Sequence, residues 1–288
     1  PRDGVHVEKQ MIPTEMKVEI ISALVEAGMK HIQVASFVNP SRVPQMADAE
    51  EVVNRLPESH GTIFSGLVLN IRGLQRALQA GLNHVEISIS VSDTHSRKNA
   101  GISFDRAFNQ VMEMLQLARA EGIRVRAGIQ CAFGCVYEGG VSQERIERLA
   151  GTYASQKVDA IALSDTTGMA NPVSVKRLLQ TLMPACDEIP IVLHLHDTRG
   201  LGLANLMAAL ECGVDQFDTA LAGMGGCPFV RGAAGNIATE DTVHLMHALG
   251  IGTGVDIAAV SKCSHRLEEY LSKRFPGKMH RLLLQEGL

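Results

Sequence analysis

Two histidines separated by one residue are the clearest chemical signal in the sequence. His194 and His196 end the apolar run that begins at Ile191, and Asp197 follows them. Alternate side chains of a β-strand share a face, so the two imidazoles would lie side by side. Such a pair can bind a divalent metal ion through its ring nitrogens. A strand that carries two histidines without a metal also explains the pattern, so other residues must distinguish these two interpretations.

The composition narrows the class of protein. The chain has 288 residues, a hydrophobic content of 45% and a formal net charge of -4. This charge gives no reason to expect a nucleic-acid partner, and no apolar run is long enough to suggest a membrane span. Six cysteines are too few for a disulfide framework in a chain of this length, which favours a reducing compartment. Cys131 and Cys135 lack a second pair to complete a zinc site, so we interpret them as structural.

Strand-like and helix-like segments alternate along most of the chain. Seven apolar runs have the length and residue types of buried parallel strands, and a helical pattern follows each of them. The predicted strands are residues 31–36, 62–69, 84–90, 124–131, 159–165, 191–196 and 216–223. Before them we expect a polar loop over residues 1–9 and a helix from Thr14 that ends near Gly28.

This alternation predicts an α/β fold, a (β/α)8 TIM barrel that forms a single catalytic domain over residues 1–288. Seven units are one short of such a barrel, so we expect its first strand to lie upstream of Pro1. Residues from about 255 to 288 are expected to form a short C-terminal helical extension. A doubly wound open sheet is the alternative, but no G-x-G-x-x-G motif follows the first strands.

The barrel would bring scattered polar residues to one rim, because active sites of this fold lie at the carboxyl ends of the strands. The residues that end a strand or follow it are Arg2, Asp3, Gln33, Ser36, Asp165, Thr166, His194, His196, Cys227 and Asn236. Asp3 offers a carboxylate, the histidines two imidazoles and Asn236 an amide oxygen. This set suits Mg²⁺, Mn²⁺ or Zn²⁺. Cys227 could compete as a ligand, but a thiolate would select Zn²⁺.

Four longer segments surround these residues: PRDG, SFVNPSRVPQMAD, HLHDTRGLGLAN and GMGGCPFVRGAAGNIATED. They resemble the signatures of the 3-hydroxy-3-methylglutaryl-CoA lyase family, and the resemblance covers almost the whole chain. It implies a barrel of the wider metal-dependent group that includes isopropylmalate synthase. It also implies a divalent cation, usually Mg²⁺ or Mn²⁺. The implied reaction is a retro-Claisen cleavage of a 3-hydroxyacyl-CoA to acetyl-CoA and a keto acid, which is acetoacetate when the substrate is hydroxymethylglutaryl-CoA.

The resemblance implies a role for each motif residue. The implied metal ligands are Asp3, His194, His196 and Asn236. Arg2 matches the residue that stabilises the enolate, Cys227 the catalytic cysteine of a glycine-rich loop, and Asp165 an active-site acid. Asp3 or His194 could take the proton of the substrate hydroxyl. A permanently protonated arginine suits a thioester enolate, because the enolate carries negative charge on oxygen.

Two positions depart from the family motifs. Gln33 stands where the family has a Glu, and an amide carries no charge and exchanges no proton at neutral pH. Gly128 stands where the family places a Tyr, which would enlarge the pocket. These changes are compatible with drift or with an altered substrate. The alternative substrates are citramalyl-CoA and a 3-hydroxyglutaryl-CoA with a longer 3-substituent.

Two other functions remain open at this point. A synthase of the isopropylmalate or citramalate type would run the Claisen step forwards. However, only about thirty residues follow the last barrel helix, too few for a regulatory domain. A non-catalytic metal-binding barrel would keep the ligands but would not need Arg2 or Cys227.

The acyl-CoA substrate is expected to meet side chains at the same rim. The predicted substrate-binding residues are Gln33, Ser36, Asn70, Asn99 and Thr166. We also expect a homodimer with its contact in the C-terminal helical residues, and neither a nucleic acid nor a membrane as a partner. The expected compartment is the cytoplasm of a bacterium or, in a eukaryote, the mitochondrial matrix.

Overall fold

Seven parallel strands form one curled sheet in the order β1-β2-β3-β4-β5-β6-β7. The computed structural model describes residues 2–6, 8–186, 188–226 and 234–285. The strands are β1 His31–Ser36, β2 Ile63–Val68, β3 His84–Ser90, β4 Arg124–Gln130, β5 Ala160–Ser164, β6 Ile191–His194 and β7 Gln216–Asp218. Each strand pairs in parallel with the next one along the chain. The predicted α/β fold of the TIM-barrel type is therefore confirmed.

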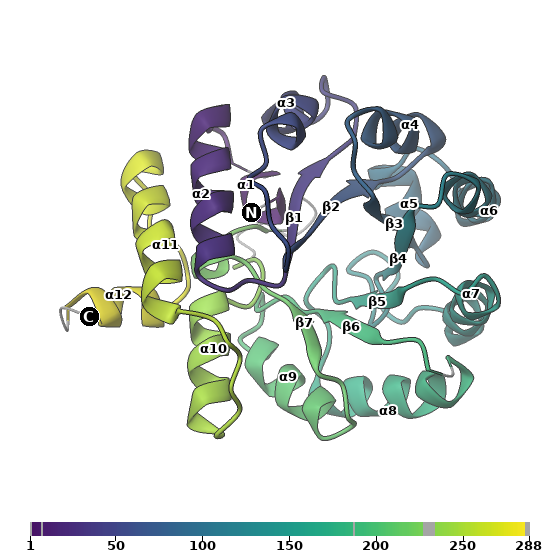
Figure 1. Ribbon diagram of the computed structural model, residues 1–288. Helices are drawn as coiled ribbons and strands as arrows, with labels where there is room; N and C mark the ends of the chain where they lie inside the picture. The colour runs from purple at the N-terminus through teal and green to yellow at the C-terminus, as the bar shows by residue number, and fades with distance from the viewer. Residues whose placement is uncertain (1, 7, 187, 227–233, 286–288) are drawn as a thin grey trace.

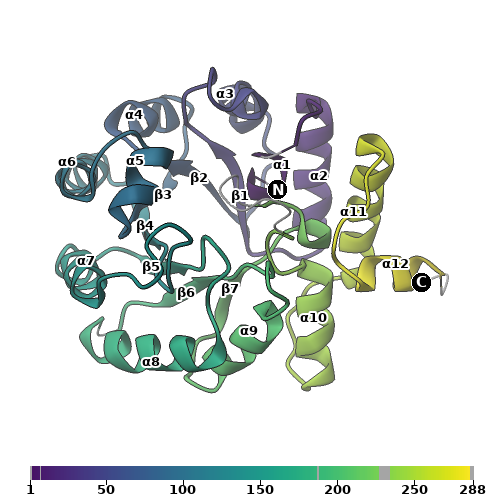
Figure 2. The ribbon, with the colours of Figure 1, turned by 180° about the vertical axis from the view of Figure 1, so that it is seen from behind.

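Helices surround the sheet, and Figures 1 and 2 show them around its outside. The α-helices are α1 Arg2–His6, α2 Thr14–Glu26, α3 Ala49–Asn54, α4 Ile71–Gln79, α5 Asp93–Asn99, α6 Phe104–Ala120, α7 Gln143–Ser155, α8 Pro172–Leu182, α9 Gly202–Leu210, α10 Thr239–Ala248, α11 Ile257–Leu271 and α12 Met279–Gln285. Three short 3-10 helices are η1 Pro44–Met46, η2 Met183–Ala185 and η3 Leu221–Gly223. In the described part of the chain, no helix combines the length and the apolar character that a membrane crossing requires.

The alternation of side chains along the strands separates an apolar outer face from a polar interior. Ile87 on β3 and Ile129 on β4 are fully buried in the hydrophobic core that joins sheet and helices. Residues an odd number of positions away along each strand face the other way. In the β3–β4 register Glu86 lies opposite Arg126, and Ser88 lies opposite Gly128. The barrel interior therefore carries charged and small polar side chains.

Two local expectations were wrong, and one helix was not predicted. Residues Arg2–His6 form helix α1 and not a loop, because Arg2 and Val5 are buried by the rest of the fold. Residues 93–99 form helix α5, which Ser92 caps by accepting a hydrogen bond from the His95 N–H. The last strand is shorter than predicted, since β7 ends at Asp218 and η3 follows it. In these places tertiary packing and capping outweigh the propensity of a polar segment to form a loop.

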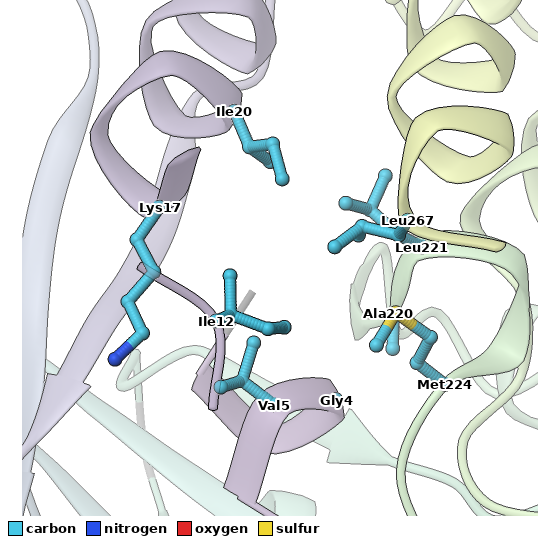
Figure 3. Close-up of a pocket in the computed structure, with 9 residues that line it drawn as sticks. All are labelled: Gly4, Val5, Ile12, Lys17, Ile20, Ala220, Leu221, Met224 and Leu267. Carbon is cyan, nitrogen blue, oxygen red and sulfur yellow. The ribbon is translucent and has the colours of Figure 1, made fainter. Parts of the chain in front are cut away.

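Apolar contacts between the two ends of the described chain hold α1 in place. Figure 3 shows the side chains of Val5, Ile12 and Ile20 on one side of a small pocket, with Leu221, Met224 and Leu267 on the other. Gly4 has no room for a side chain, because a Cβ there would lie 2.8 Å from the Met224 Cβ. Lys17 directs its ammonium away from this pocket (Figure 3), to Asp48 Oδ1 at 2.7 Å. These contacts fix the position of Arg2 and Asp3 at the start of α1.

The sheet remains open between its two edge strands. Among the described residues β1 and β7 are not paired with each other, and a cavity of about 410 Å³ lies between them. Residues of both strands line this cavity, together with the start of α1. The expected strand upstream of Pro1 lies outside this sequence and stays a prediction.

Candidate functional site

Three side chains from distant parts of the chain converge at the carboxyl ends of the strands. His194 ends β6, and His196 follows it in an isolated antiparallel bridge with Asn236. Their Nε2 atoms lie 3.2 Å apart, and Asp3 Oδ2 lies 3.9 Å from the Nε2 of His194. One ligand atom from each of Asp3, His194 and His196 lies within 4.8 Å of the others. The cluster therefore forms a possible metal site, as the two histidines and the barrel predicted.

Asn236 completes this cluster through its bridge to His196. Its Nδ2 donates to Asp3 Oδ2 at 2.6 Å and to the Met224 carbonyl oxygen at 3.0 Å. The Asn236 Oδ1 is buried and has no hydrogen-bond partner among the described residues. A buried carbonyl oxygen without a partner is costly, and a cation would satisfy it. This orphaned oxygen is an independent sign that the site is built for a cation.

The electrostatics of the cluster also suit a cation. Burial lowers the pKa of His196 to about 4, so its imidazole is neutral at pH 7. Burial alone would raise the pKa of Asp3, but the charge of Arg2 and the two histidines hold it well below its usual range. For His194, burial lowers the pKa, and the hydrogen bond to Asp218 with the charge of Asp3 outweighs that effect and raises it. An ionised carboxylate thus lies beside a neutral imidazole, and these are donors that a divalent cation uses.

Asp218 orients His194 from the other side. Its Oδ2 lies 3.1 Å from the His194 Nδ1, so the ring presents a hydrogen at Nδ1 and its Nε2 toward the cluster. Arg126 in turn donates to both carboxylate oxygens of Asp218, with Nη1 2.8 Å from Oδ1. Arg126 also contacts Glu86 at 2.7 Å, and both residues are buried. These three charged residues, Asp218, Arg126 and Glu86, are functional candidates that the sequence reading missed.

Arg2 is fixed by two partners beside the cluster. Its Nη1 donates to Asp3 Oδ1 at 2.5 Å, and its Nε donates to Gln33 Oε1 at 2.5 Å. Gln33 uses its amide nitrogen to donate to Glu86 Oε2 at 2.8 Å. The guanidinium is buried, with 9% of the residue exposed, yet it lines a cavity. It is therefore positioned to meet a negative charge there.

This cavity, of about 130 Å³, is the space in which a substrate would meet the cluster. Its wall combines Arg2, Asp3 and both histidines with polar residues from several neighbouring strands and loops. Of the predicted substrate-binding residues, Asn99 and Thr166 line it. Gln33 lines the adjoining cavity between β1 and β7. It is linked to the substrate cavity by its hydrogen bond with Arg2, which lines both cavities.

Other predicted site residues lie elsewhere. Asp165 is buried, and its Oδ1 accepts hydrogen bonds from the backbone N–H groups of Met169 and Ala170 in its own loop. Burial raises its pKa to about 6. Asn70 caps helix α4 by accepting from the Gly73 N–H, and the hydroxyl of Ser36 is buried without a partner. None of these three side chains lines the substrate cavity as the structure describes it.

Cys227, predicted as the catalytic cysteine, lies outside the described residues. The cysteines that are described carry free thiols. Cys131 and Cys135 are fully buried, and burial raises the pKa of the Cys131 thiol above its usual range. This burial agrees with the structural interpretation of the pair.

The fold and this cluster together define an α/β-barrel enzyme with a possible metal site at the carboxyl ends of its strands. A model of the HMGL-like family matches residues 1–266. The mitochondrial hydroxymethylglutaryl-CoA lyase of Mus musculus is 37% identical over 279 residues, which are 97% of this chain and 86% of that enzyme. The chain belongs to the HMGL-like family, and it is a carbon–carbon lyase of that type.

Two solved structures support the family assignment. The HMG-CoA lyase of Bacillus subtilis superposes with a TM-score of 0.93 at 35% identity, covering 98% of this chain and 95% of that one. The HMG-CoA lyase of Acinetobacter baumannii, in complex with coenzyme A and 3-methylmalate, gives 0.92 at 36% identity, covering 98% and 92%. The barrel of this chain is therefore shared with lyases over nearly its full length.

Proposed function

We propose that this protein is a divalent-metal-dependent lyase that cleaves hydroxymethylglutaryl-CoA to acetyl-CoA and acetoacetate. The observation that carries the proposal is the convergence of Asp3, His194 and His196 beside the guanidinium of Arg2 in one cavity. The names of the relatives support the substrate, and the coenzyme A bound to the Acinetobacter baumannii lyase supports an acyl-CoA.

The proposed metal ligands are Asp3, His194, His196 and the Oδ1 of Asn236. We propose Mg²⁺ or Mn²⁺, because the set is rich in oxygen and neutral nitrogen, although two imidazoles also suit Zn²⁺. When bound, the cation supplies positive charge that lowers the pKa of a substrate hydroxyl. Asp218 assists by fixing the His194 ring through its Nδ1.

The side chains of the protein then handle a proton and a negative charge. Asp3 and His194, two of the ionisable groups of the cluster, are the proposed acceptors of the hydroxyl proton. As the carbon–carbon bond breaks, negative charge develops on the thioester oxygen, and Arg2 is the proposed group that stabilises it. Removing one such donor typically costs about 3 kcal/mol of transition-state stabilisation. Protonation of the acetyl-CoA enolate is assigned to Cys227 on the family resemblance alone.

Asp165 receives a different proposed role from the one that its motif implies. Its Oδ1 holds the backbone of residues 169 and 170, so we assign it to shaping the loop that carries Thr166. The proposed substrate contacts are Thr166 and Asn99 at the cavity wall. Lys98, whose ammonium lies 5.0 Å from the Tyr137 ring centroid, is a neighbouring cation that could meet a CoA phosphate.

The proposal extends to the organisation of the protein. One hydrophobic core that runs from Val5 to Phe275 supports a single catalytic domain. We propose a homodimer, with α11 and α12 as its contact, because these helices lie together at one side of the barrel (Figure 1). The proposed compartment is the mitochondrial matrix in a eukaryote or the cytoplasm in a bacterium.

A related acyl-CoA is the second candidate substrate, and one observation favours it. Gly128 and the small side chain of Ser88 lie opposite each other, and Ser88 lines the cavity. Ser88 and Glu86 fill the space beside Gly128, so the room for a longer 3-substituent is proposed to come from the small side chain of Ser88 at the cavity wall. Citramalyl-CoA and 3-hydroxyglutaryl-CoA with longer 3-substituents are therefore the compounds to compare.

The test is a panel of these acyl-CoA esters with Mg²⁺-loaded protein, followed by the release of acetyl-CoA. The proposal expects the highest kcat/KM with hydroxymethylglutaryl-CoA and its loss in Arg2→Met. His194→Ala should lose activity as well, and His60→Ala, at an exposed histidine between α3 and β2, is its matched control. A clearly higher kcat/KM with another ester would favour the second candidate substrate. Cleavage of none of them would reject both.

A further inference from the structure

We propose that Glu86 is a positioning residue of this active site. Through Gln33 it orients Arg2, and through Arg126 it orients the pair of Asp218 and His194. The proposal relies on the proposed function for the reaction that is measured, but its contacts are independent of the substrate. Glu86 is buried, with 6% of the residue exposed, and it lies on β3 between the strands that carry its two partners.

The first branch leads from Glu86 to Arg2 through an amide that has only one useful orientation. Arg2 can only donate, so the Gln33 oxygen must face its Nε, which lies 2.5 Å away. The Glu86 Oε2 accepts from the Gln33 amide nitrogen at 2.8 Å, so this nitrogen faces Glu86. Without a carboxylate at position 86, the amide loses the partner that determines this orientation. Arg2 would then lose a fixed acceptor beside the cavity.

The second branch leads from Glu86 to the metal cluster. Glu86 Oε2 accepts from the Arg126 Nε at 3.0 Å, and Arg126 is the direct neighbour of Glu86 across the β3–β4 pair. The same guanidinium crosses the barrel interior to both oxygens of Asp218. Asp218 then holds the Nδ1 of His194. Both carboxylates contact the Nη2 of Arg126, so loss of one frees Arg126 to shift toward the other.

The space around Glu86 explains the glycine on β4. A Cβ at Gly128 would lie 2.4 Å from the Ser88 Oγ and 3.1 Å from the Glu86 Oε1. A larger residue at 128 would therefore displace Ser88 and also press against the Glu86 carboxylate. Both positions at which the sequence departs from the family motifs, Gln33 and Gly128, thus adjoin the side chain of Glu86.

The experiment exchanges the amide and the carboxylate between the two strands. We compare Glu86→Gln, Gln33→Glu and the double variant Gln33→Glu/Glu86→Gln. The matched control is Glu50→Gln, which removes a carboxylate from a bidentate pair with Arg76 on the outer helices α3 and α4. For each variant we measure kcat and KM for hydroxymethylglutaryl-CoA with Mg²⁺, the Kd for Mn²⁺ by electron paramagnetic resonance, and Tm.

The proposal expects a specific pattern. Glu86→Gln lowers kcat by about 10- to 100-fold and raises the Mn²⁺ Kd by about tenfold, with a smaller change in KM, as is typical for a lost outer-shell partner. Gln33→Glu places two carboxylates against each other and also lowers kcat. The double variant again pairs one amide with one carboxylate, so it recovers kcat to within about threefold of the wild type, because contacting residues couple. Glu50→Gln keeps the wild-type kcat and the wild-type Mn²⁺ Kd.

Two results would overturn the proposal. The first is a Glu86→Gln protein with wild-type kcat and Mn²⁺ affinity. The second is a double variant whose fold-loss in kcat equals the product of the two single fold-losses, because two independent structural substitutions would behave in this way. If the wild type cleaves no hydroxymethylglutaryl-CoA, the proposed function fails alone. The Mn²⁺ Kd of the wild type and the four variants then decides the proposal, since the second branch affects it without any substrate.

Discussion

A single methyl group at position 128 tests how closely the wall of the site is packed. A Cβ on Gly128 would lie 2.8 Å from the Ser88 Cβ and 2.4 Å from its Oγ. Carbon atoms in contact are about 3.5–4.0 Å apart, so the methyl group would overlap by about 1 Å. Both atoms belong to one short side chain on the neighbouring strand, which has little freedom to withdraw. The overlap must therefore move the β3 backbone or Ser88.

This overlap sets the expected size of the effect. Overpacking of a core position costs about 1–3 kcal/mol. In a protein of this size each kcal/mol lowers Tm by roughly 2–4 °C, so Gly128→Ala should lower it by about 2–12 °C. The added Cβ would also lie 3.1 Å from the Glu86 Oε1. Because Glu86 is proposed to position the site, kcat should fall as well.

Thermal unfolding and steady-state kinetics check this prediction together. Adding Ser88→Gly to Gly128→Ala should restore most of the Tm, because the two closest contacts belong to Ser88. Gly151→Ala on helix α7 is the control, since nothing lies within 4 Å of a Cβ there and alanine favours a helix. A Gly128→Ala protein with the Tm and kcat of the wild type would refute the packing described for this wall.

Three further predictions concern the cluster, its metal and a buried acid. Asp218→Asn should weaken Mn²⁺ binding by about 10- to 100-fold, measured by titration, and unchanged affinity would show that His194 needs no partner at Nδ1. A chelator should abolish turnover and Mg²⁺ or Mn²⁺ should restore it, whereas recovery with Zn²⁺ only would contradict the proposed cation. Burial raises the pKa of Glu240 from 4.5 to about 7, so the folded state holds this proton more tightly and loses stability as pH rises between these values. The free energy of unfolding, measured with urea, should therefore fall between pH 5 and pH 8, and Glu240→Gln should reduce this fall by on the order of 3 kcal/mol. An equal fall in the variant and the wild type would show that Glu240 is not its origin.

Much of the barrel was predictable because its signals are local. Each strand is an apolar run of a few residues, and each following helix has its own periodicity, so the order of the elements follows from the sequence. The two histidines were visible for the same reason, since both belong to one segment. Helix α1 was missed because its five residues have no periodicity to read, and contacts made by Gly4 and Val5 with distant segments stabilise it.

The network behind the site was not predictable, because it depends on distances across the barrel. Arg126 and Asp218 are separated by 92 positions, and only the curling of the sheet brings them together. A charged residue within a buried strand was the available signal, and it applies to Glu86 and Arg126, whereas Asp218 lies half-buried at the end of β7. Such a residue must have a partner, but the sequence does not say which one.

The central claim is that this barrel uses a divalent cation to break a carbon–carbon bond of hydroxymethylglutaryl-CoA. The most direct measurement is the amount of acetyl-CoA and acetoacetate that chelator-treated protein releases before and after addition of Mg²⁺. We expect equal amounts of both products, formed only after the cation is added and lost in His194→Ala. A folded, Mg²⁺-loaded wild-type protein that leaves hydroxymethylglutaryl-CoA uncleaved would contradict this mechanism.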